Sequence, residues 1–380
     1  MRRSTFPPPP PRAPEGVQEN VLLAPRTTLC VGGPAAHFLE ARDETKVLEA
    51  LAWARKQGID VAFLGGGSNV LVADRGFDGL VLRVAIGGIN HAMEGDRVTL
   101  SAGAGVSWDA LVAMAVEHGW AGLECLSGIP GDVGAAPIQN IGAYGQEAGD
   151  TITFVYCIDR RSGATVGIDR AGCRFGYRDS IFKRRGRGRF VVVGVTFSLQ
   201  RNGPATVRYP ELERFLRSEG AGASPSLAEV RQAVLELRRR KSMLLESGDE
   251  NARSAGSFFV NPTLDEEEWA RARARIEAAG VLGGGESIPQ FPASGGRVKV
   301  PAAWLIERAG FHKGSGEGTV GLSTKHALAI VNRGGATAED ILRFARRLRD
   351  GVLARFGVRL VPEPVFLGFQ PHEIEDLVGH

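Results

Sequence analysis

Apolar residues repeat at helical spacing in the segment that follows Asp43, and the repeat continues as far as Gly58. An amphipathic helix is predicted by these positions, which are Val47, Leu48, Leu51 and Ala52. Residues 59–64 (IDVAFL) then form a mostly apolar run that predicts a buried strand, and this run ends directly at Gly65. The pattern therefore predicts a helix, a strand and a glycine-rich loop in succession.

A second series of strands and one helix follows. Residues 74–79 are rich in turn formers, and a helix is predicted from Ser107, as its N-cap, to Gly119, as its C-cap. The strands that the pattern predicts after Gly65 cover residues 80–84, 97–103, 151–158 and 190–199. This part of the chain is therefore expected to be rich in sheet.

From about Arg201 the pattern changes to helices with short strands between them. Ser226 and Glu229 form a capping box that opens a helix ending near Lys241. Another helix is predicted from Thr337 to Phe356, with Gly357 directly after it. The last predicted strand covers residues 358–368, in which the prolines at 362 and 364 flank Glu363; such prolines are confined to sheet edges or bulges.

The length and composition indicate an ordinary globular protein. A chain of 380 residues accommodates two or three domains, and its 43% apolar and 23% charged residues are typical of soluble proteins. No apolar run is long enough to cross a membrane, and a proline run replaces the apolar segment of a secretory signal, so we expect a cytoplasmic protein. The expected division is a disordered Pro-rich arm (1–22), two units (23–93, joined by 357–369, and 94–200), a third domain (201–356) and a tail (370–380).

Cysteine spacing and net charge exclude several classes of function. The four cysteines have no CxxC spacing, so no metal site and no disulfide framework are predicted. The net charge of +3 is small, and the basic cluster formed by Arg184, Arg185, Arg187 and Arg189 has no interleaved aromatic residues. We therefore interpret that cluster as a solvated hairpin tip and predict no nucleic-acid partner.

Two glycine-rich segments indicate a site for a phosphate-containing ligand. They are GGGSNVL (65–71) and IPGDVGAAPIQNIGAYG (129–145). Glycines allow backbone N–H groups to approach an anion closely, although a single such loop is a plain tight turn at least as often. Two loops indicate an extended ligand with more than one phosphate, which we interpret as a flavin dinucleotide. The fingerprints GxGxxG, GxxxxGK[ST], HExxH and GxSxG are absent.

Three further residues are candidates for chemistry, and each has a plain structural alternative. Arg178 in CRFGYRDSIF suits bidentate binding of a substrate carboxylate, or a structural ion pair. Ser257 in SAGSFFVNP is a candidate acid, or a turn hydroxyl bonded to its own backbone. Glu363 lies on a rigid segment between its prolines, or is a solvated edge carboxylate.

Taken together in this order, GGGSNVL, IPGxxGAAPIQNIGAYG, CRFGYRDSIFK, AGSFFxNP and PEPVF resemble the UDP-N-acetylenolpyruvoylglucosamine reductases of peptidoglycan synthesis. The resemblance runs from about Thr27 to Gly368. It implies an α+β fold: a two-subdomain FAD-binding module of the vanillyl-alcohol-oxidase type, followed by a smaller α/β substrate-binding domain. The flavin is expected to be non-covalent, because His37, His91 and His118 lie outside both glycine loops.

The resemblance also implies the partners and the site residues. The family transfers hydride from NADPH to FAD, and then to the enolpyruvyl double bond of UDP-N-acetylglucosamine enolpyruvate. Arg178 and Glu363 are expected at the substrate carboxylate and Ser257 as the proton donor. The residues expected to bind FAD are Gly65, Gly66, Gly67, Ser68, Asn69, Val70, Leu71, Gly131, Gly134, Ala135, Pro137, Ile138, Gln139, Asn140, Gly142, Ala143, Tyr144 and Gly145.

The expected substrate-binding residues rest on weaker matches, and they are Tyr177, Tyr209, Lys241, Asn261 and His326. An equal alternative for Lys241 is a charge that balances the dipole at the C-terminus of its helix. An equal alternative for His326 is a strand histidine whose hydrogen bonds are satisfied within the fold. A monomer is expected. Two other functions stay open: a nucleotide-sugar-binding regulator that has lost turnover, and another flavin oxidase or dehydrogenase on the same scaffold.

Overall fold

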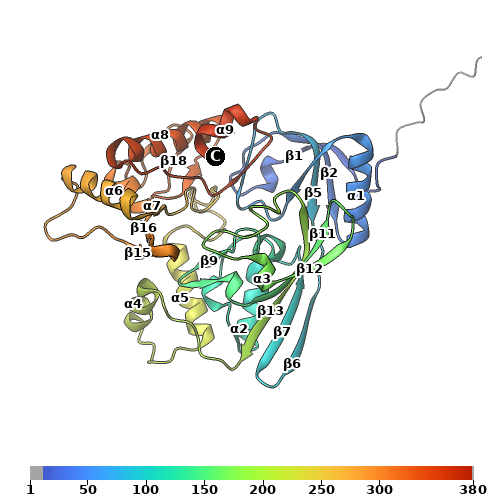
Figure 1. The fold of residues 1–380 in the computed structure, drawn as a ribbon, viewed down its shortest axis with the longest axis horizontal. Helices are drawn as coiled ribbons and strands as arrows, with labels where there is room; N and C mark the ends of the chain where they lie inside the picture. Colours follow the sequence, from blue (N-terminus) through green and yellow to red (C-terminus); the bar gives the residue numbers. More distant parts are fainter. Residues whose placement is uncertain (1–11, 379–380) are drawn as a thin grey trace, which may run out of the picture.

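The computed structural model describes residues 12–378, and its first unit is a four-stranded sheet in the order β1-β2-β5-β3. Strand β1 is antiparallel to β2, whereas β2, β5 and β3 are parallel neighbours. Helix α1 (Glu44–Gln57) begins at Asp43, whose side chain accepts a hydrogen bond from the Lys46 amide, and ends at Gly58 with a left-handed φ of 68°. The predicted helix is therefore confirmed (Figure 1). The strands are β1 (Gln18–Leu22), β2 (Pro34–Ala41), β3 (Asp60–Leu64) and β5 (Phe77–Val84), and a 3-10 turn, η1 (Ala24–Arg26), follows β1.

A separate two-stranded parallel pair brings the C-terminal part of the chain beside the first glycine loop. Strand β4 (Val70–Val72) directly follows that loop and pairs with β20 (Val365–Leu367). Two predictions need correction here. The predicted strand at 358–368 is regular only over β20, because its two prolines have no N–H to donate to a ladder, and the predicted turn at 74–79 ends earlier, since β5 begins at Phe77.

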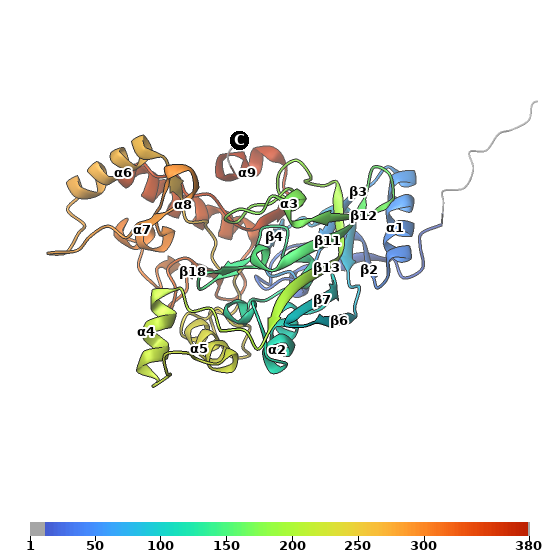
Figure 2. The ribbon, with the colours of Figure 1, turned by 60° about the horizontal axis from the view of Figure 1, so that its bottom comes forward.

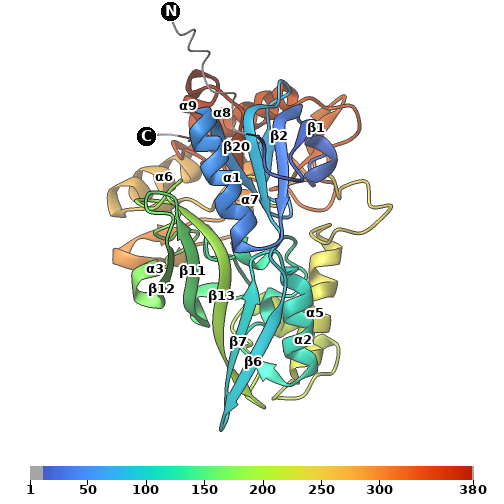
Figure 3. The same ribbon diagram turned by 90° about the vertical axis from the view of Figure 1, so that its right-hand side faces the viewer.

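The second unit is an antiparallel sheet in the order β12-β11-β13-β7-β6, with β8 paired to the end of β13 (Figures 1 and 3). Strand β6 belongs to this sheet, so the first unit ends near residue 85 and not at 93 as expected. Helix α2 (Trp108–Glu117) forms as predicted between Ser107 and Gly119. The strands are β6 (Ile89–Glu94), β7 (Arg97–Gly103), β8 (Trp120–Ala121), β11 (Ile152–Asp159), β12 (Thr165–Asp169) and β13 (Phe190–Arg201).

Short elements occupy the connection between α2 and β11, which contains the second glycine segment. They are η2 (Glu124–Leu126), η3 (Val133–Ala135), β9 (Gly142–Ala143), β10 (Gln146–Glu147) and η4 (Ala148–Asp150). After β12 comes one helical turn, α3 (Arg170–Cys173). One continuous apolar core joins α1, the inner faces of both sheets and α2.

Helices α4 (Pro210–Ser218) and α5 (Leu227–Arg240) pack on the second unit. The capping box predicted at Ser226 is present. A small apolar cluster joins both helices to Cys125 of η2, and α5 also contacts α2 (Figure 2). The expectation of one domain over 201–356 is therefore wrong in its first forty residues, because their apolar face is buried against η2 and α2.

The remaining elements share a third core. Helix α8 (Ala338–Phe356) lies at its centre and begins at the predicted cap, Thr337. Leu29, Val31 and Leu71 from the first unit are buried in the same core. The other elements of this part are β14 (Thr263–Leu264), α6 (Glu266–Ala278), β15 (Phe291–Pro292), η5 (Ser294–Gly296), β16 (Val298–Lys299), α7 (Ala302–Arg308), β17 (Gly316–Glu317), β18 (Val320–Leu322), β19 (Ile330–Asn332) and α9 (Pro371–Val378).

Both predicted terminal extensions contain regular structure. Residues 1–11 of the predicted arm lie outside the described part of the chain, but Gln18–Leu22 of that arm is strand β1. The predicted tail is mostly helix α9, in which Leu377 is fully buried. Its Asp376 accepts hydrogen bonds from Arg346 and from Arg349, whose side chain is only 10% exposed. Among residues 12–378, no helix is both long enough and apolar enough to cross a membrane.

Candidate active site

The two glycine loops lie against each other. An added Cβ at Gly66 would be 2.9 Å from the Gly131 Cα, and the Ser68 hydroxyl donates to the Pro130 carbonyl over 3.1 Å. At Gly67 an added Cβ would be 2.0 Å from the Arg26 carbonyl oxygen. Glycine is therefore required at positions 66 and 67 because other backbone segments come close to them. The sequence had suggested a different reason, namely the approach of backbone N–H groups to an anion.

The first loop also presents unused donors. Within the described residues, the backbone amides of Gly66, Gly67, Ser68 and Asn69 donate no hydrogen bond. Gly67 has a left-handed φ of 67°, and such a residue turns successive N–H groups toward one point. Four unused amides beside a second glycine loop suit the diphosphate of a dinucleotide cofactor.

An unused acceptor lies at the same place. Asp132 Oδ2 is buried without a partner in the described part, 3.6 Å from the position of a Cβ on Gly65. Burial raises the pKa of this carboxyl group, and Arg83 opposes that shift. A buried acceptor needs a donor, and the hydroxyl groups of a flavin dinucleotide supply such donors. The residues present therefore fit FAD.

Most predicted side-chain donors of the second loop are used inside the protein. Asn140 donates to Glu147 and to the Gly176 carbonyl, and accepts from the Gly149 amide. The Gln139 side chain accepts from Asn69 over 3.2 Å and donates to Glu363 over 3.1 Å. These side chains position the loops and Glu363, which leaves the backbone as the main source of contacts to a cofactor.

The other residues expected to bind FAD occupy varied places. Val70 and Leu71 are buried in β4, and Gly134 packs on Ala104. The Ile138 carbonyl accepts from the buried Ser180 hydroxyl. Ala135 of η3 is exposed, and Pro137, two residues later, is buried. Gly142 and Ala143 form β9. Gly145 lies next to Arg208 and has a left-handed φ of 82°.

Glu363 and Arg178 form the central pair of the site. Arg178 Nε lies 3.2 Å from Glu363 Oε1, and the two side chains are 21% and 13% exposed. Burial raises the pKa of Glu363 above its usual 4.5, although Arg178, Lys183 and the hydrogen bond from Gln139 favour the anion. The local environment thus favours a proton on Glu363 more than water does.

The backbone holds Arg178 in a tight turn. Gly176 and Asp179 exchange backbone hydrogen bonds, and Arg178 between them has a left-handed φ of 52°. Its guanidinium donates to the Gly142 carbonyl over 2.8 Å, and Lys183 Nζ donates to the Arg178 carbonyl over 3.1 Å. A non-glycine residue in this region is strained, and such strain is concentrated at functional sites.

Ser257 reaches the same place through a strand-like crossing. Gly256 turns the chain with a φ of 70°, and two residues later the Phe258 carbonyl accepts from the Glu363 amide over 2.8 Å. The pairing continues at Val260, whose amide donates to the Val361 carbonyl over 3.0 Å. The Ser257 side chain is half-buried, and within the described residues its hydroxyl makes no hydrogen bond, so it is not a turn hydroxyl.

A second group gathers around Tyr144. Tyr144 and Tyr209 pack edge to face with ring centres 5.6 Å apart, and Lys241 Nζ lies 5.7 Å from the Tyr144 ring centre. Lys241 also forms an ion pair with Glu211 over 2.6 Å. Tyr144 was expected at the flavin, but the structure places it with two residues expected at the substrate.

His326 lies near this group and is surrounded by cations. Desolvation and the charges of Lys241, Lys313 and Arg238 lower its pKa to about 4, so the imidazole is neutral at pH 7. Its ring makes no hydrogen bond within the described residues, which excludes a hydrogen-bonded structural histidine. A cluster of this kind suits an anion.

Tyr177 and Asn261 form a smaller group on the other side of Arg178. The centre of the Tyr177 ring lies 4.4 Å from Lys299 Nζ. Burial raises the pKa of the Tyr177 hydroxyl, and Arg178 and Asn261 oppose that shift. Asn261 Oδ1 also accepts from the Ala302 amide at the start of α7. Asn261 therefore has a structural role, whatever it contributes to binding.

Several residues near the site were not predicted from the sequence. Arg238 is the most informative, because its Nε is buried without a partner in the described part while Nη2 donates to the Met243 carbonyl. Burial lowers its pKa, with Tyr144 and Asp109 opposing that shift. No sequence pattern distinguishes Arg238, since it stands in a run of helix-terminal arginines. Lys183, Lys299 and Asp132 were also missed.

Two family models match the chain. The one described as an FAD binding domain matches residues 35–168. The one described as the UDP-N-acetylenolpyruvoylglucosamine reductase C-terminal domain matches residues 248–367, which include Ser257 and Glu363. These matches and the two-unit architecture confirm the predicted fold class.

Whole-chain relatives give the same result. The UDP-N-acetylenolpyruvoylglucosamine reductase of Thermobifida fusca is 48% identical over 351 residues, covering 92% of this chain and 97% of its own. That of Streptomyces coelicolor is 48% identical over 363 residues, 94% and 93% of the two chains. The crystal structure of the reductase from Thermus caldophilus superposes with a TM-score of 0.62 at 26% identity, covering 92% and 98%. The chain therefore belongs to the UDP-N-acetylenolpyruvoylglucosamine reductase family of FAD-dependent enzymes.

Proposed function

We propose that this enzyme reduces the enolpyruvyl group of UDP-N-acetylglucosamine enolpyruvate with NADPH, which yields UDP-N-acetylmuramate for peptidoglycan synthesis. Relatives with this activity in their names share almost half of the residues over more than nine-tenths of the chain. The observation that carries the proposal is the largely buried Arg178 and Glu363 pair, together with the Ser257 segment, whose next residue Phe258 accepts from the Glu363 amide.

Bound FAD supplies the hydride chemistry, since it accepts hydride from NADPH and donates it to the substrate double bond. The amides of Gly66 to Asn69 would hold its diphosphate, and Asp132 would accept from one of its hydroxyl groups. Neither glycine loop contains a histidine for a covalent link, so binding is non-covalent.

Arg178 and Glu363 recognise the carboxylate of the enolpyruvyl group. Negative charge builds up on this carboxylate and the neighbouring carbon when hydride arrives, and the Arg178 guanidinium stabilises that charge electrostatically. Glu363 would repel it as an anion. Its raised pKa makes a proton-bearing Glu363 available as a hydrogen-bond donor instead.

Ser257 donates the proton to the carbon next to the carboxylate. A hydroxyl is a weak acid, but the carbanion-like carbon is a strong base, so correct placement outweighs acidity. The crossing of residues 258–260 over 361–363 fixes the Ser257 backbone relative to Glu363. An unbonded hydroxyl is free to turn toward substrate.

The cation group around His326 would bind the diphosphate of the sugar nucleotide. Lys241 and Arg238 come from the end of α5, and Lys313 comes from the exposed loop that follows α7. Tyr144 and Tyr209 supply flat surfaces beside them. We also propose that the enzyme is located in the cytoplasm, because four free cysteines suit a reducing compartment. The proposed oligomeric state is a monomer, and light scattering, which measures the molar mass in solution, tests it.

An NADPH oxidation assay on FAD-loaded enzyme tests this function. We expect NADPH consumption to depend on UDP-N-acetylglucosamine enolpyruvate under anaerobic conditions, with one UDP-N-acetylmuramate formed per NADPH. Oxidation that needs dioxygen in place of the sugar nucleotide would instead identify an oxidase. Tight sugar-nucleotide binding without product would identify a regulator, and either result would contradict the proposal.

A further inference from the structure

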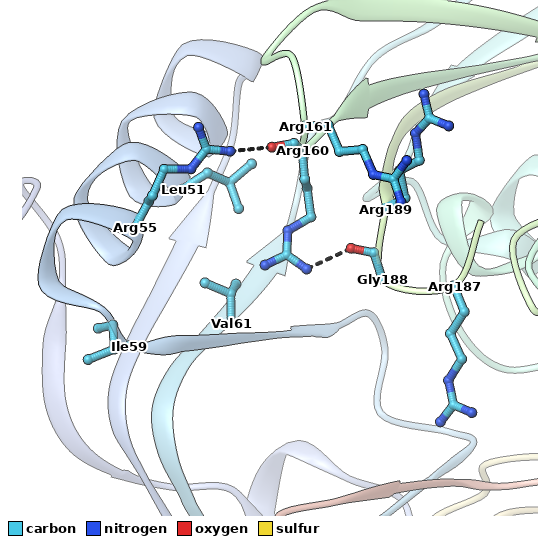
Figure 4. A pocket seen from close by; sticks show the side chains of 9 residues that line it. All are labelled: Leu51, Arg55, Ile59, Val61, Arg160, Arg161, Arg187, Gly188 and Arg189. Atoms are coloured by element: carbon cyan, nitrogen blue, oxygen red, sulfur yellow. Dashed lines mark hydrogen bonds between the residues drawn. The ribbon is translucent and has the colours of Figure 1, made fainter. Parts of the chain in front are cut away.

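A cavity of about 390 Å³ lies between α1, β3 and the tip of the β11–β12 hairpin (Figure 4). It is lined by Leu51, Arg55, Ile59, Val61, Arg160, Arg161, Arg187, Gly188 and Arg189. None of these residues belongs to the glycine loops or to the Arg178 and Glu363 site. The basic cluster that the sequence indicated as a solvated hairpin tip thus contributes two arginines to a cavity wall.

The charges around this cavity are unbalanced. Five arginines line it, and among residues 12–378 only Arg189 of these five is in an ion pair, with Asp159. Asp60 interacts more weakly with Arg160, so five positive charges face two negative ones. No carboxylate lines the cavity itself.

Arg160 is held in place by a hydrogen bond to the backbone. It extends into the middle of the cavity, where Nη1 donates to the Gly188 carbonyl over 2.7 Å (Figure 4). Arg55 Nη2 donates to the Arg160 carbonyl over 2.5 Å. Burial and the charge of Arg55 lower the pKa of Arg160, so an anion placed beside it would relieve repulsion between these two cations.

The opposite wall is apolar. Leu51 comes from α1, Ile59 and Val61 from the start of β3, and the Arg160 guanidinium lies 5.3 Å from the centre of the Phe63 ring. The volume lies within the range of about 300–1,000 Å³ that is usual for small-molecule sites. Arginine forks bind phosphate oxygens in pairs, and apolar walls suit a flat ring.

We propose that this cavity is a second small-molecule site, which binds a diphosphate group such as that of a nucleoside diphosphate or free pyrophosphate. Arg160 and Arg55 form its fixed floor. Arg161 and Arg187, which are exposed and have no side-chain partner within the described residues, close on the phosphates from the rim.

Calorimetric titration of FAD-loaded enzyme with ADP and with pyrophosphate tests this site. We expect saturable binding of one molecule per chain that weakens with added salt, and at least a tenfold lower affinity in the Arg161→Ala/Arg187→Ala double variant. Tighter binding of ADP than of pyrophosphate identifies a nucleotide as the ligand, and equal binding identifies the phosphates alone.

The matched control removes two exposed arginines elsewhere. Arg170→Ala/Arg185→Ala lowers the net charge equally without touching the cavity, and it should bind as the wild type does. Flavin absorbance and NADPH oxidation should be unchanged in both double variants. Affinity within twofold of wild type in Arg161→Ala/Arg187→Ala, binding that FAD displaces, or no binding at millimolar ligand would overturn the proposal.

Discussion

At the scale of single residues, the site depends on groups whose hydrogen-bonding capacity is left open. Ser257 has an unused hydroxyl in the described part, whereas the side chains of Gln139 and Asn140 hydrogen-bond inside the protein. Ser257 and these two amides therefore have different roles, because a side chain that is bonded within the fold positions its partners, whereas an unbonded hydroxyl is available to a ligand.

Replacement of Ser257 by alanine tests its role as the acid. We expect Ser257→Ala to be reduced by NADPH at the wild-type rate and to turn over the enolpyruvyl substrate about 10² to 10⁴-fold more slowly, because a positioned acid contributes that much. Stopped-flow flavin absorbance separates the two half-reactions. Ser254→Ala, a nearby serine that hydrogen-bonds to the Gly256 amide, is the control and should keep the second rate. Near-normal turnover in Ser257→Ala would exclude this assignment.

Replacement of Glu363 by glutamine tests its protonation. In the folded protein the pKa of Glu363 is raised above 4.5. The contribution of this carboxyl group to the free energy of unfolding is therefore complete below pH 4.5 and is lost as the pH rises through the folded-state pKa. Glu363→Gln should therefore gain thermal stability relative to wild type as the pH increases above about 4.5. The difference in Tm between the two proteins, measured from pH 4 to 8, checks this; a difference that shrinks with pH would show a lowered pKa instead.

At the scale of elements, the two glycine loops act as one unit. Strand β4, which follows the first loop, pairs with β20, which follows Glu363. In addition, Asn69 of the first loop donates to Gln139 of the second loop, and Gln139 donates to Glu363. Gly66 and Gly67 allow this contact, since their added Cβ atoms would collide with Gly131 and Arg26. Gly65 has no such neighbour, as its nearest contact would be 3.6 Å away.

Two alanine variants separate packing from cofactor contact. Gly66→Ala should destabilise the flavin-free protein by about 1–3 kcal/mol, the usual cost of overpacking. Gly65→Ala should leave the Tm of flavin-free protein unchanged but weaken FAD binding, because its Cβ would point into the ligand space. Thermal unfolding of apoprotein and fluorescence titration with FAD give the two quantities. Equal destabilisation of both apoproteins would contradict this division.

At the scale of the whole molecule, the proposed substrate site is assembled from separate cores. Helix α5 packs on the second unit and supplies Lys241 and Arg238, whereas Lys313 and His326 come from the loops that follow α7 and β18. Desolvation and then the charges of these three cations lower the pKa of His326, and a bound diphosphate would offset the charges.

Lys241→Met tests this arrangement. We expect KM for the sugar nucleotide to rise about tenfold, the effect of losing one charge-assisted hydrogen bond, with kcat within twofold of wild type. Arg240→Met, which removes a solvent-exposed neighbour paired with Glu236, should change neither constant. Steady-state kinetics at two salt concentrations provides the measurement, and a fall in kcat with unchanged KM in Lys241→Met would oppose a binding role.

The sequence by itself determined the local structure and the chemistry. Helices with clear periodicity and caps, such as Glu44–Gln57 and Ala338–Phe356, formed where expected, because capping and periodicity act within a few residues. The motifs around Arg178, Ser257 and Glu363 identified the family for the same reason, since each is a short segment with its own residue pattern.

Only the tertiary structure decided which of those groups act together. It buried helix α9 against Arg349, attached α4 and α5 to the second unit, and packed Tyr144 against Tyr209 and near Lys241. It also brought arginines from 55, 160 and 187 around one cavity. Contacts between residues more than a hundred positions apart depend on how complete elements pack, and no local pattern of apolar and polar residues specifies that packing.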